Sequence, residues 1–199
     1  MKVVIVGATG TVGKAVVAEL APRHEIIQVG KSRGQYQADI KDADSIRALF
    51  GKIGKVDAIV STTGKVHFGP LAQMTPELFK IGLHDKLLGQ VQLALIGVDY
   101  LNDGGSITLT SGVLGHDPIR NGANASAVNG GIDSFVKAAA IELPRGIRIN
   151  VVSATVLVEA MDVYGPAFRG YVPVPGQRVA LAYSKSVEGA QTGQIYSVL

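Results

Sequence analysis

The chain alternates short, largely apolar runs with longer amphipathic segments whose apolar residues recur every three or four positions. The short runs predict buried parallel strands at residues 3–6, 24–29, 37–40, 56–60, 106–110, 147–152 and 194–198. The amphipathic segments predict helices at residues 14–20, 41–50, 82–101, 124–143 and 177–187, with a further helix opening at 75–77. Strictly alternating strands and helices are typical of a doubly wound α/β sheet. We therefore expect one three-layer Rossmann-like domain over residues 1–199, with strand order 3-2-1-4-5-6-7.

Three glycines separate the first strand from the first helix. In a dinucleotide-binding turn, the first glycine permits the tight turn and the second lets the backbone approach a pyrophosphate. The third lets helix and strand pack closely, and the helix N-terminus then faces the phosphates. The spacing here, Gly-x-x-Gly-x-x-Gly, differs from the Gly-x-Gly-x-x-Gly fingerprint, and a tight turn without a ligand remains the alternative. Placement after the first strand favours a nucleotide site formed by Gly7, Thr9, Gly10, Thr11, Val12 and Gly13.

The loop after the second strand indicates which nicotinamide cofactor would bind. An acidic residue at that strand end would bond the 2′-hydroxyl of NAD, whereas cations accommodate the 2′-phosphate of NADP. Gly30 occupies the position of the acid, and Lys31, Ser32 and Arg33 follow. Two cations and a hydroxyl suit a phosphate dianion. A solvated surface turn is the alternative, but the position favours NADP(H).

Composition and charge exclude several other classes of protein. The net charge is +3 and the lysines and arginines are scattered, so we expect no nucleic-acid partner. The absence of cysteine excludes disulfides, thiolate nucleophiles and Cys-zinc sites, and the histidines show no metal-ligand spacing. No apolar stretch is long enough to span a bilayer, and the N-terminus has no signal-peptide pattern. We therefore expect a cytoplasmic protein with no membrane partner and no metal.

The order of these motifs resembles the short-chain dehydrogenase/reductase family over nearly the whole chain. The matching segments are the glycine turn, Asp39-Ile40, Ser61-Thr62-Thr63-Gly64, the strand ending at Ser111, the strand at 148–151 and the final Thr192-Gly193-Gln194. The resemblance implies that Asp39 and Ile40 meet the adenine, that residues 61–64 line the cofactor and that Ser111 hydrogen-bonds a substrate carbonyl. It also implies a homodimer or homotetramer joined through the two long helices.

The chain departs from the family at its catalytic pair. The family has a Tyr, with a Lys four residues later on the same helix face, and this Lys lowers the pKa of the Tyr. Here Ala125 stands at the Tyr position and Asn129 at the Lys position, and none of the six tyrosines precedes a Lys at that spacing. On the other long helix, Lys86 replaces the family's Asn. We therefore expect the Lys86 ammonium to lie near Asn129 and Ser111, touching the cofactor, although a solvated Lys86 is the alternative.

Two functions fit these residues. The first is an oxidoreductase that transfers hydride between NADP(H) and a small carbonyl or alcohol of unknown identity. In it Ser111, Lys86, Asn129 and His116 are the catalytic candidates, and Lys86 or His116 takes over the proton transfer of the missing Tyr. The second is a catalytically degenerate sensor or scaffold protein that binds NADP(H). The missing Tyr supports the second function, whereas the retained Ser111 and the exchange of Lys and Asn support the first. The glycine turn fits both.

Overall fold

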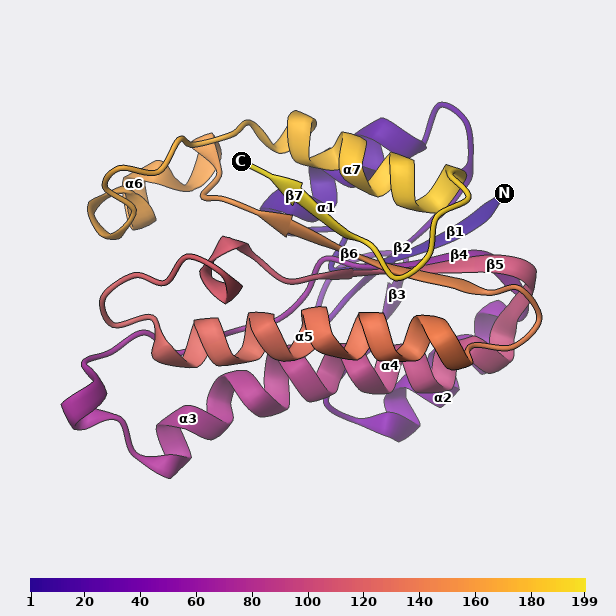
Figure 1. Cartoon of the computed structure of the whole chain (residues 1–199). Coiled ribbons are helices and arrows are strands. Elements are labelled where there is room, and N and C mark those ends of the chain that lie inside the picture. The colour runs from indigo at the N-terminus through magenta and orange to yellow at the C-terminus, as the bar shows by residue number, and fades with distance from the viewer.

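The computed structural model describes all 199 residues as one α/β domain. Seven parallel strands form a single sheet in the order β3-β2-β1-β4-β5-β6-β7, which confirms the predicted order. The carboxyl ends of these strands point to the left in Figure 1. The strands are β1 (Lys2–Val6), β2 (Glu25–Gly30), β3 (Tyr36–Gln37), β4 (Val56–Ser61), β5 (Leu101–Thr110), β6 (Arg148–Ala154) and β7 (Ile195–Val198).

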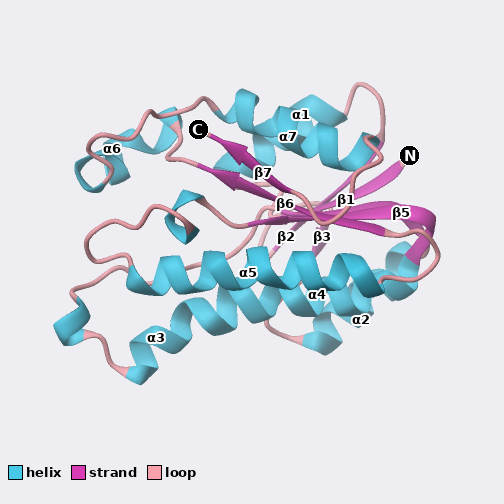
Figure 2. Cartoon of the chain, in the orientation of Figure 1, coloured by secondary structure: helices cyan, strands magenta, loops and turns pink.

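Helices cover both faces of the sheet, as Figure 2 shows by their colour. Helices α1 (Thr11–Leu20) and α7 (Gly176–Glu188) pack together on one face. The other face carries α2 (Ala43–Ile53), α3 (Pro76–Gly82), α4 (Gly89–Gly97) and α5 (Ala123–Glu142). The short α6 (Met161–Tyr164) lies beyond the carboxyl ends of the strands. No helix combines the length and the apolar character that crossing a bilayer requires.

Side-chain alternation along the strands builds two separate cores. In β1, Val3 and Ile5 face α1 and α7, whereas Val4 and Val6 face α2, α4 and α5. Because adjacent residues of a strand point to opposite faces, a strand buried on both sides must be apolar throughout. This explains the continuous β-branched run at the start of the chain.

Several predicted element boundaries were wrong, among them those of the third strand, the fifth strand and the helix at 82–101. The third strand is only two residues long, because the chain turns at Asp39, whose carboxylate accepts the backbone N–H of Lys41. The fifth strand starts at Leu101 instead of 106, and its first part contains an irregular stretch with Gly104 at φ 73°. The helix expected at 82–101 is part of a longer helical stretch from Pro76 to Tyr100, because Thr75 caps its start by accepting the N–H of Leu78.

Candidate functional site

The glycine turn packs tightly against its neighbours everywhere except at its outer edge. A Cβ on Gly13 would lie 2.1 Å from the carbonyl oxygen of Gly7, so only glycine lets α1 approach the turn this closely. Gly7 itself has φ 91°, and a Cβ there would lie 2.7 Å from side-chain atoms of Thr62 and Thr63. Gly10 is exposed, and its nearest potential clash is 3.3 Å away. The turn therefore leaves one glycine free to be covered by a ligand.

The N-terminus of α1 is suited to an anion. Gly10 occupies the N-cap position, no side chain caps the helix, and the first turn contains no acidic residue. The first N–H groups of a helix lack partners within the helix and carry partial positive charge. Thr11 is exposed at this end, while Val12 is half-buried and packs toward the core. These features fit the pyrophosphate of a dinucleotide.

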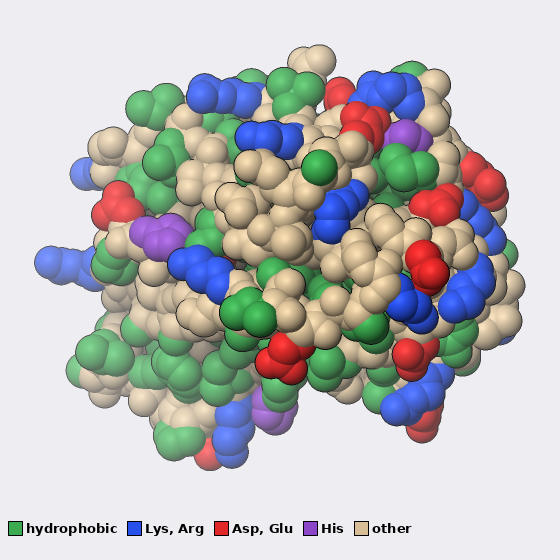
Figure 3. All heavy atoms as spheres, turned by 45° about the vertical axis from the view of Figure 1, so that its right-hand side comes forward, with side chains coloured by type: hydrophobic (Ala, Val, Ile, Leu, Met, Phe, Trp, Pro, Cys, Tyr) green, Lys and Arg blue, Asp and Glu red, His purple; other side chains and the backbone are tan.

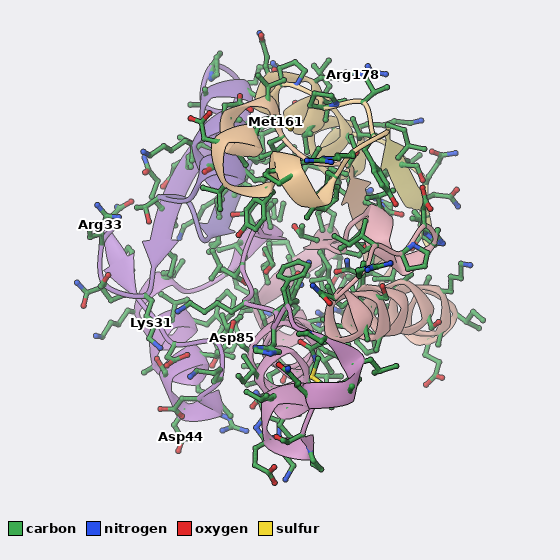
Figure 4. All side chains as sticks on the ribbon, turned by 90° about the vertical axis from the view of Figure 1, so that its left-hand side faces the viewer. Lys31, Arg33, Asp44, Asp85, Met161 and Arg178 are labelled. Atoms are coloured by element: carbon green, nitrogen blue, oxygen red, sulfur yellow. The ribbon has the colours of Figure 1, made fainter.

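In the loop after β2, one of the two cations predicted to bind phosphate is paired with a carboxylate and the other is not. Lys31 Nζ lies 2.9 Å from Asp39 Oδ2, and the pair lowers the pKa of the Asp39 carboxyl. Arg33 is exposed and forms no ion pair, and Ser32 is exposed beside it. Figure 4 places Lys31 and Arg33 together at one edge of the molecule. A Cβ on Gly30 would lie 2.0 Å from the carbonyl oxygen of Arg33, so this loop leaves no room for an acidic side chain there.

The tetrapeptide after β4 lies beside the glycine turn. The hydroxyls of Ser61 and Thr63 are 2.8 Å apart, and Thr62 donates to the carbonyl oxygen of Val6 at 3.2 Å. Gly64, at φ 125°, packs flat on Lys86, whose side-chain carbons would overlap any Cβ added at that glycine. This segment thus connects the glycine turn to Lys86 by direct contacts.

Ile40 does not offer its side chain to a ligand. It is buried in the core against Gly89 of α4, where a Cβ would lie 2.6 Å from the Ile40 Cδ1. Its carbonyl oxygen accepts a hydrogen bond from the Gln92 side chain at 3.4 Å. The expected adenine contact is therefore limited to Asp39 and to the backbone of Ile40.

Lys86 lies in a π-helical segment, Leu83–Leu88, between α3 and α4. Such wider turns are rare within helices and occur often at functional sites. The ammonium donates to the carbonyl oxygen of Ser111 and to Asn129 Oδ1, both at 2.8 Å. These contacts place the ammonium where the exchange of Lys and Asn between the two helices predicted it. Burial lowers the pKa of Lys86 to about 8, and the negative charge of Asp133 opposes the shift.

An apolar pocket of about 240 Å³ opens beside Lys86 and Asn129. Eleven of its fifteen lining residues are hydrophobic. Ala125, at the position of the family's Tyr, is part of its wall. The aromatic lining residues are Phe68, Tyr164 and Phe168. The pocket therefore suits a small apolar group presented to a lysine.

Ser111 and His116 do not face this pocket, contrary to the roles expected for them. The Ser111 hydroxyl is buried and makes no hydrogen bond, and the adjacent Gly112 lines the pocket instead. His116 lines a neighbouring cavity of about 290 Å³, together with Asp117, Ser153 and Thr155. Neither residue is among those that line the apolar pocket.

Sequence reasoning missed Asp133, which lies one helical turn after Asn129. Its carboxylate is 4% exposed and lies 3.1 Å from His116 Nε2, without the alignment of a hydrogen bond. Burial raises the pKa of this carboxyl, whereas the nearby Ser111 hydroxyl and the charges of His116, Lys137 and Lys86 lower it. The sequence could have indicated this site. Asp133 lies four positions after Asn129, on the same helix face as the buried Ile132 and Val136, where a charged residue is unusual.

The surface offers no extended region of one charge on the face that Figure 3 shows. Lysines, arginines and acidic residues alternate there. On the face that carries the strand ends, Asp85 lies near the centre, to the right of Lys31 and well below Met161 (Figure 4). Asp85 accepts the backbone N–H of Lys65 at 2.7 Å and so fixes the loop that leads from Gly64 into the pocket wall.

Comparison with known proteins agrees with this architecture. A sequence model described as enoyl-(acyl carrier protein) reductase matches residues 1–197. Trihydroxynaphthalene reductase of Colletotrichum orbiculare is 30% identical over 181 residues, which cover 86% of this chain and 63% of the relative. A versicolorin reductase of Emericella nidulans is 29% identical over 180 residues, which cover 83% of this chain and 67% of the relative. The chain thus spans roughly two thirds of the length of these relatives.

Solved structures share the whole fold. The protein lin1944 from Listeria innocua is 49% identical with a TM-score of 0.98, and the match covers 100% of both chains. A small-chain dehydrogenase in complex with NADPH is 26% identical with a TM-score of 0.88, covering 100% of this chain and 96% of the other. Together with the sheet order and the glycine turn, these matches show that the chain belongs to the short-chain dehydrogenase/reductase family.

Proposed function

We propose that this protein is an NADP(H)-dependent oxidoreductase acting on a small, apolar carbonyl compound or the corresponding alcohol. The observation that carries the proposal is the position of Lys86. Its amine lies at the wall of an apolar pocket and connects through Gly64 and Thr63 to the glycine turn. Cofactor and substrate sites are thus joined by a cation that can exchange a proton near neutral pH.

The residues present fit a nicotinamide dinucleotide. Gly10 and the uncapped N-terminus of α1 would hold the pyrophosphate, and Arg33 with Lys31 would meet the 2′-phosphate. When bound, the cofactor supplies the hydride. Asn129 and the Ser111 carbonyl orient the Lys86 amine, which donates or accepts the proton, and the hydrophobic lining excludes water. Burial makes Lys86 a better proton donor, because its ammonium has a pKa of about 8.

Direct measurements test this proposal. NADPH should bind to the purified chain in titration calorimetry, and a panel of apolar aldehydes and ketones should oxidise it, as followed by its absorbance. Lys86→Met should weaken NADPH binding and abolish turnover. Because the Ser111 hydroxyl is buried and Ser111 does not line the pocket, Ser111→Ala should leave both largely unchanged. Binding without turnover of any carbonyl would contradict an oxidoreductase function.

A sensor or scaffold that binds NADP(H) is the second candidate. It is favoured by Ala125, which replaces the family's proton-donating Tyr in the pocket wall. In that case Lys86 would contact the cofactor without transferring a proton. Lys86→Met would then weaken NADPH binding, while neither the variant nor the natural chain would consume NADPH.

We further infer that two copies associate through α4 and α5. Leu95 on α4 is 61% exposed and Ile141 on α5 is 86% exposed. Between the helices lies an apolar groove that includes Val98, Phe135 and Leu143. Large apolar side chains gathered at one exposed face are typical of an interface. This face matches the subunit contact that the family resemblance implies.

A further inference from the structure

The Lys86 amine has surroundings that no other lysine of this chain has. All lysines except Lys2 and Lys86 are exposed. Lys2, the first residue of β1, donates to the carbonyl oxygen of Ile53. Lys86 forms no ion pair and contacts only two neutral acceptors, the Ser111 carbonyl and Asn129 Oδ1. The amine is therefore held by these two polar acceptors, here called the polar clasp, at the wall of an apolar pocket.

The geometry leaves one direction at this nitrogen free. A lysine nitrogen is tetrahedral, and Cε and the two acceptors take three of its four directions. No protein atom accepts a hydrogen bond in the fourth direction, and Lys86 lines the pocket. In the ammonium form this direction holds the third N–H. In the neutral amine it holds the lone pair, since both remaining N–H groups stay with the acceptors.

We propose that Lys86 is an amine nucleophile that captures small apolar aldehydes in this pocket as a protonated imine. This activity is separate from hydride transfer and requires no cofactor. Lysines desolvated in hydrophobic pockets are activated for such chemistry. Phe68, Tyr164 and Phe168 in the lining favour an aldehyde with an aromatic or aliphatic side group over a charged one.

The reaction balances without an oxidant or reductant. The nitrogen lone pair forms a bond to the carbonyl carbon, and the carbonyl π electrons move to the oxygen. The nitrogen then gives up one of its two protons and the oxygen takes up one, which leaves a neutral carbinolamine. A second proton on the hydroxyl lets it leave as water while the nitrogen lone pair forms the C=N bond. The net change joins amine, aldehyde and one proton into an iminium ion and water. The remaining N–H of the iminium keeps one of the two acceptors, Asn129 Oδ1 or the Ser111 carbonyl.

The proportion of neutral amine makes this capture selective. With a pKa of about 8, about one in ten Lys86 amines is neutral at pH 7, compared with fewer than about one in a thousand for an ordinary lysine. A neutral amine is required for the attack. Selective reaction at Lys86 near pH 7 is thus expected.

The test uses benzaldehyde with sodium cyanoborohydride, which reduces the imine to a stable amine, on the cofactor-free chain at pH 7. Peptide mass spectrometry should find the benzyl group on Lys86 at a rate at least about tenfold above that of any other lysine. Glyoxylate, which is charged, should label Lys86 no faster than the exposed lysines. Benzyl labelling spread over exposed lysines, with Lys86 no faster, would overturn the proposal.

Variants separate nucleophilicity from simple exposure. Asn129→Asp keeps an acceptor oxygen beside the amine but adds a negative charge that favours the ammonium, so labelling of Lys86 should fall about tenfold. Lys80→Met, on exposed α3, should change nothing. Unchanged labelling of Lys86 in a folded Asn129→Asp variant would show that Asn129 does not control the reactivity of the Lys86 amine. Thermal unfolding of each variant checks its folding.

Addition of NADPH distinguishes this proposal from the proposed function. If NADPH contacts Lys86, it should slow the labelling. If Lys86 is labelled selectively and NADPH does not slow the labelling, Lys86 is a nucleophile but NADPH does not contact it. NADPH binding by calorimetry without selective labelling would contradict the nucleophile and leave the oxidoreductase proposal standing.

Discussion

Lys31 Nζ lies 2.9 Å from Asp39 Oδ2, so the first cation expected at the 2′-phosphate is already paired with a carboxylate. The Lys31 side chain is 67% exposed, and exposed pairs of this kind contribute little to stability. A phosphate dianion can therefore compete for the lysine at small cost. Arg33 has no such competitor and needs no rearrangement of partners.

Replacing Lys31 and Arg33 together by Ala should weaken NADPH binding at least tenfold and leave NADH binding nearly unchanged. Each lost charge-assisted hydrogen bond is worth on the order of 1.5–3 kcal/mol. Titration calorimetry with both nucleotides measures the difference. Equal weakening of the two nucleotides would show that this loop does not read the 2′-phosphate.

Asp39→Asn should strengthen NADPH binding relative to NADH. The change removes a negative charge and releases Lys31, while the amide oxygen can still accept the N–H of Lys41. The gain should shrink in high salt, because exposed charges are screened. If NADPH binding weakened more than NADH binding, the Asp39 carboxylate would not compete with the 2′-phosphate for Lys31.

Gly10→Ala and Gly13→Ala should have opposite consequences. At Gly13 a Cβ would meet the Gly7 carbonyl oxygen at 2.1 Å, so Ala should lower the melting temperature strongly. At Gly10 the closest atom is 3.3 Å away, so the cofactor-free protein should remain folded with a small change in melting temperature. NADPH binding by the Gly10 variant should nevertheless fall, because the methyl group occupies the approach to the pyrophosphate. Undiminished binding would place the phosphates elsewhere.

Lys86→Met should stabilise the protein at pH 7. The folded-state pKa of about 8 lies below the ordinary value of 10.5, so folding disfavours the ammonium. Stability is then lost as the pH falls from 10.5 through 8, a loss of up to about 3 kcal/mol. Urea unfolding at pH 7 should show the gain, and at pH 10.5 the gain should largely disappear. Lys80→Met serves as the matched exposed control, and a gain independent of pH would contradict the ionisation argument.

Asp133→Asn should lower the pKa of Lys86 further below 8. The Asp133 carboxylate is the group whose charge favours the Lys86 ammonium, so its removal favours the neutral amine. NMR titration of the lysine Cε–Hε signals measures the shift directly, with exposed Lys80 as an internal reference. A Lys86 pKa that stays constant would show that the two groups titrate independently.

Leu95→Asp should convert the proposed dimer into a monomer. A carboxylate at the centre of an apolar interface costs several kcal/mol when it loses water. Because Leu95 is 61% exposed in the single chain, the same change should leave the melting temperature of the monomer nearly unaffected. Light scattering of the natural chain and of the Leu95→Asp variant reports the mass of each. A natural chain that is already monomeric would exclude this interface.

The sheet order could be predicted from the sequence because it follows from the composition and order of the strands. The tight turn at Gly7 and the close helix packing at Gly13 could be predicted because they are local steric demands. The side of the sheet toward which the Ser111 side chain points could also have been predicted from the sequence. Leu109 faces α5 and Thr110 bonds Tyr183 of α7, so alternation turns Ser111 back toward α5. The contact between His116 and Asp133 was not predictable, since it joins a loop and a helix through tertiary packing.

The π-helical segment has a consequence for the faces of the helix that contains it. One additional residue in a turn rotates everything after it by about 100° relative to an unbroken α-helix. Before the segment, Gly82 meets Asn124 of α5, and after it Gly89 and Gly97 meet Ile40 and Ile59. A single continuous helix can thereby match two differently oriented neighbours. Deleting one residue from this turn would bring the two halves into phase and carry Lys86 away from Asn129.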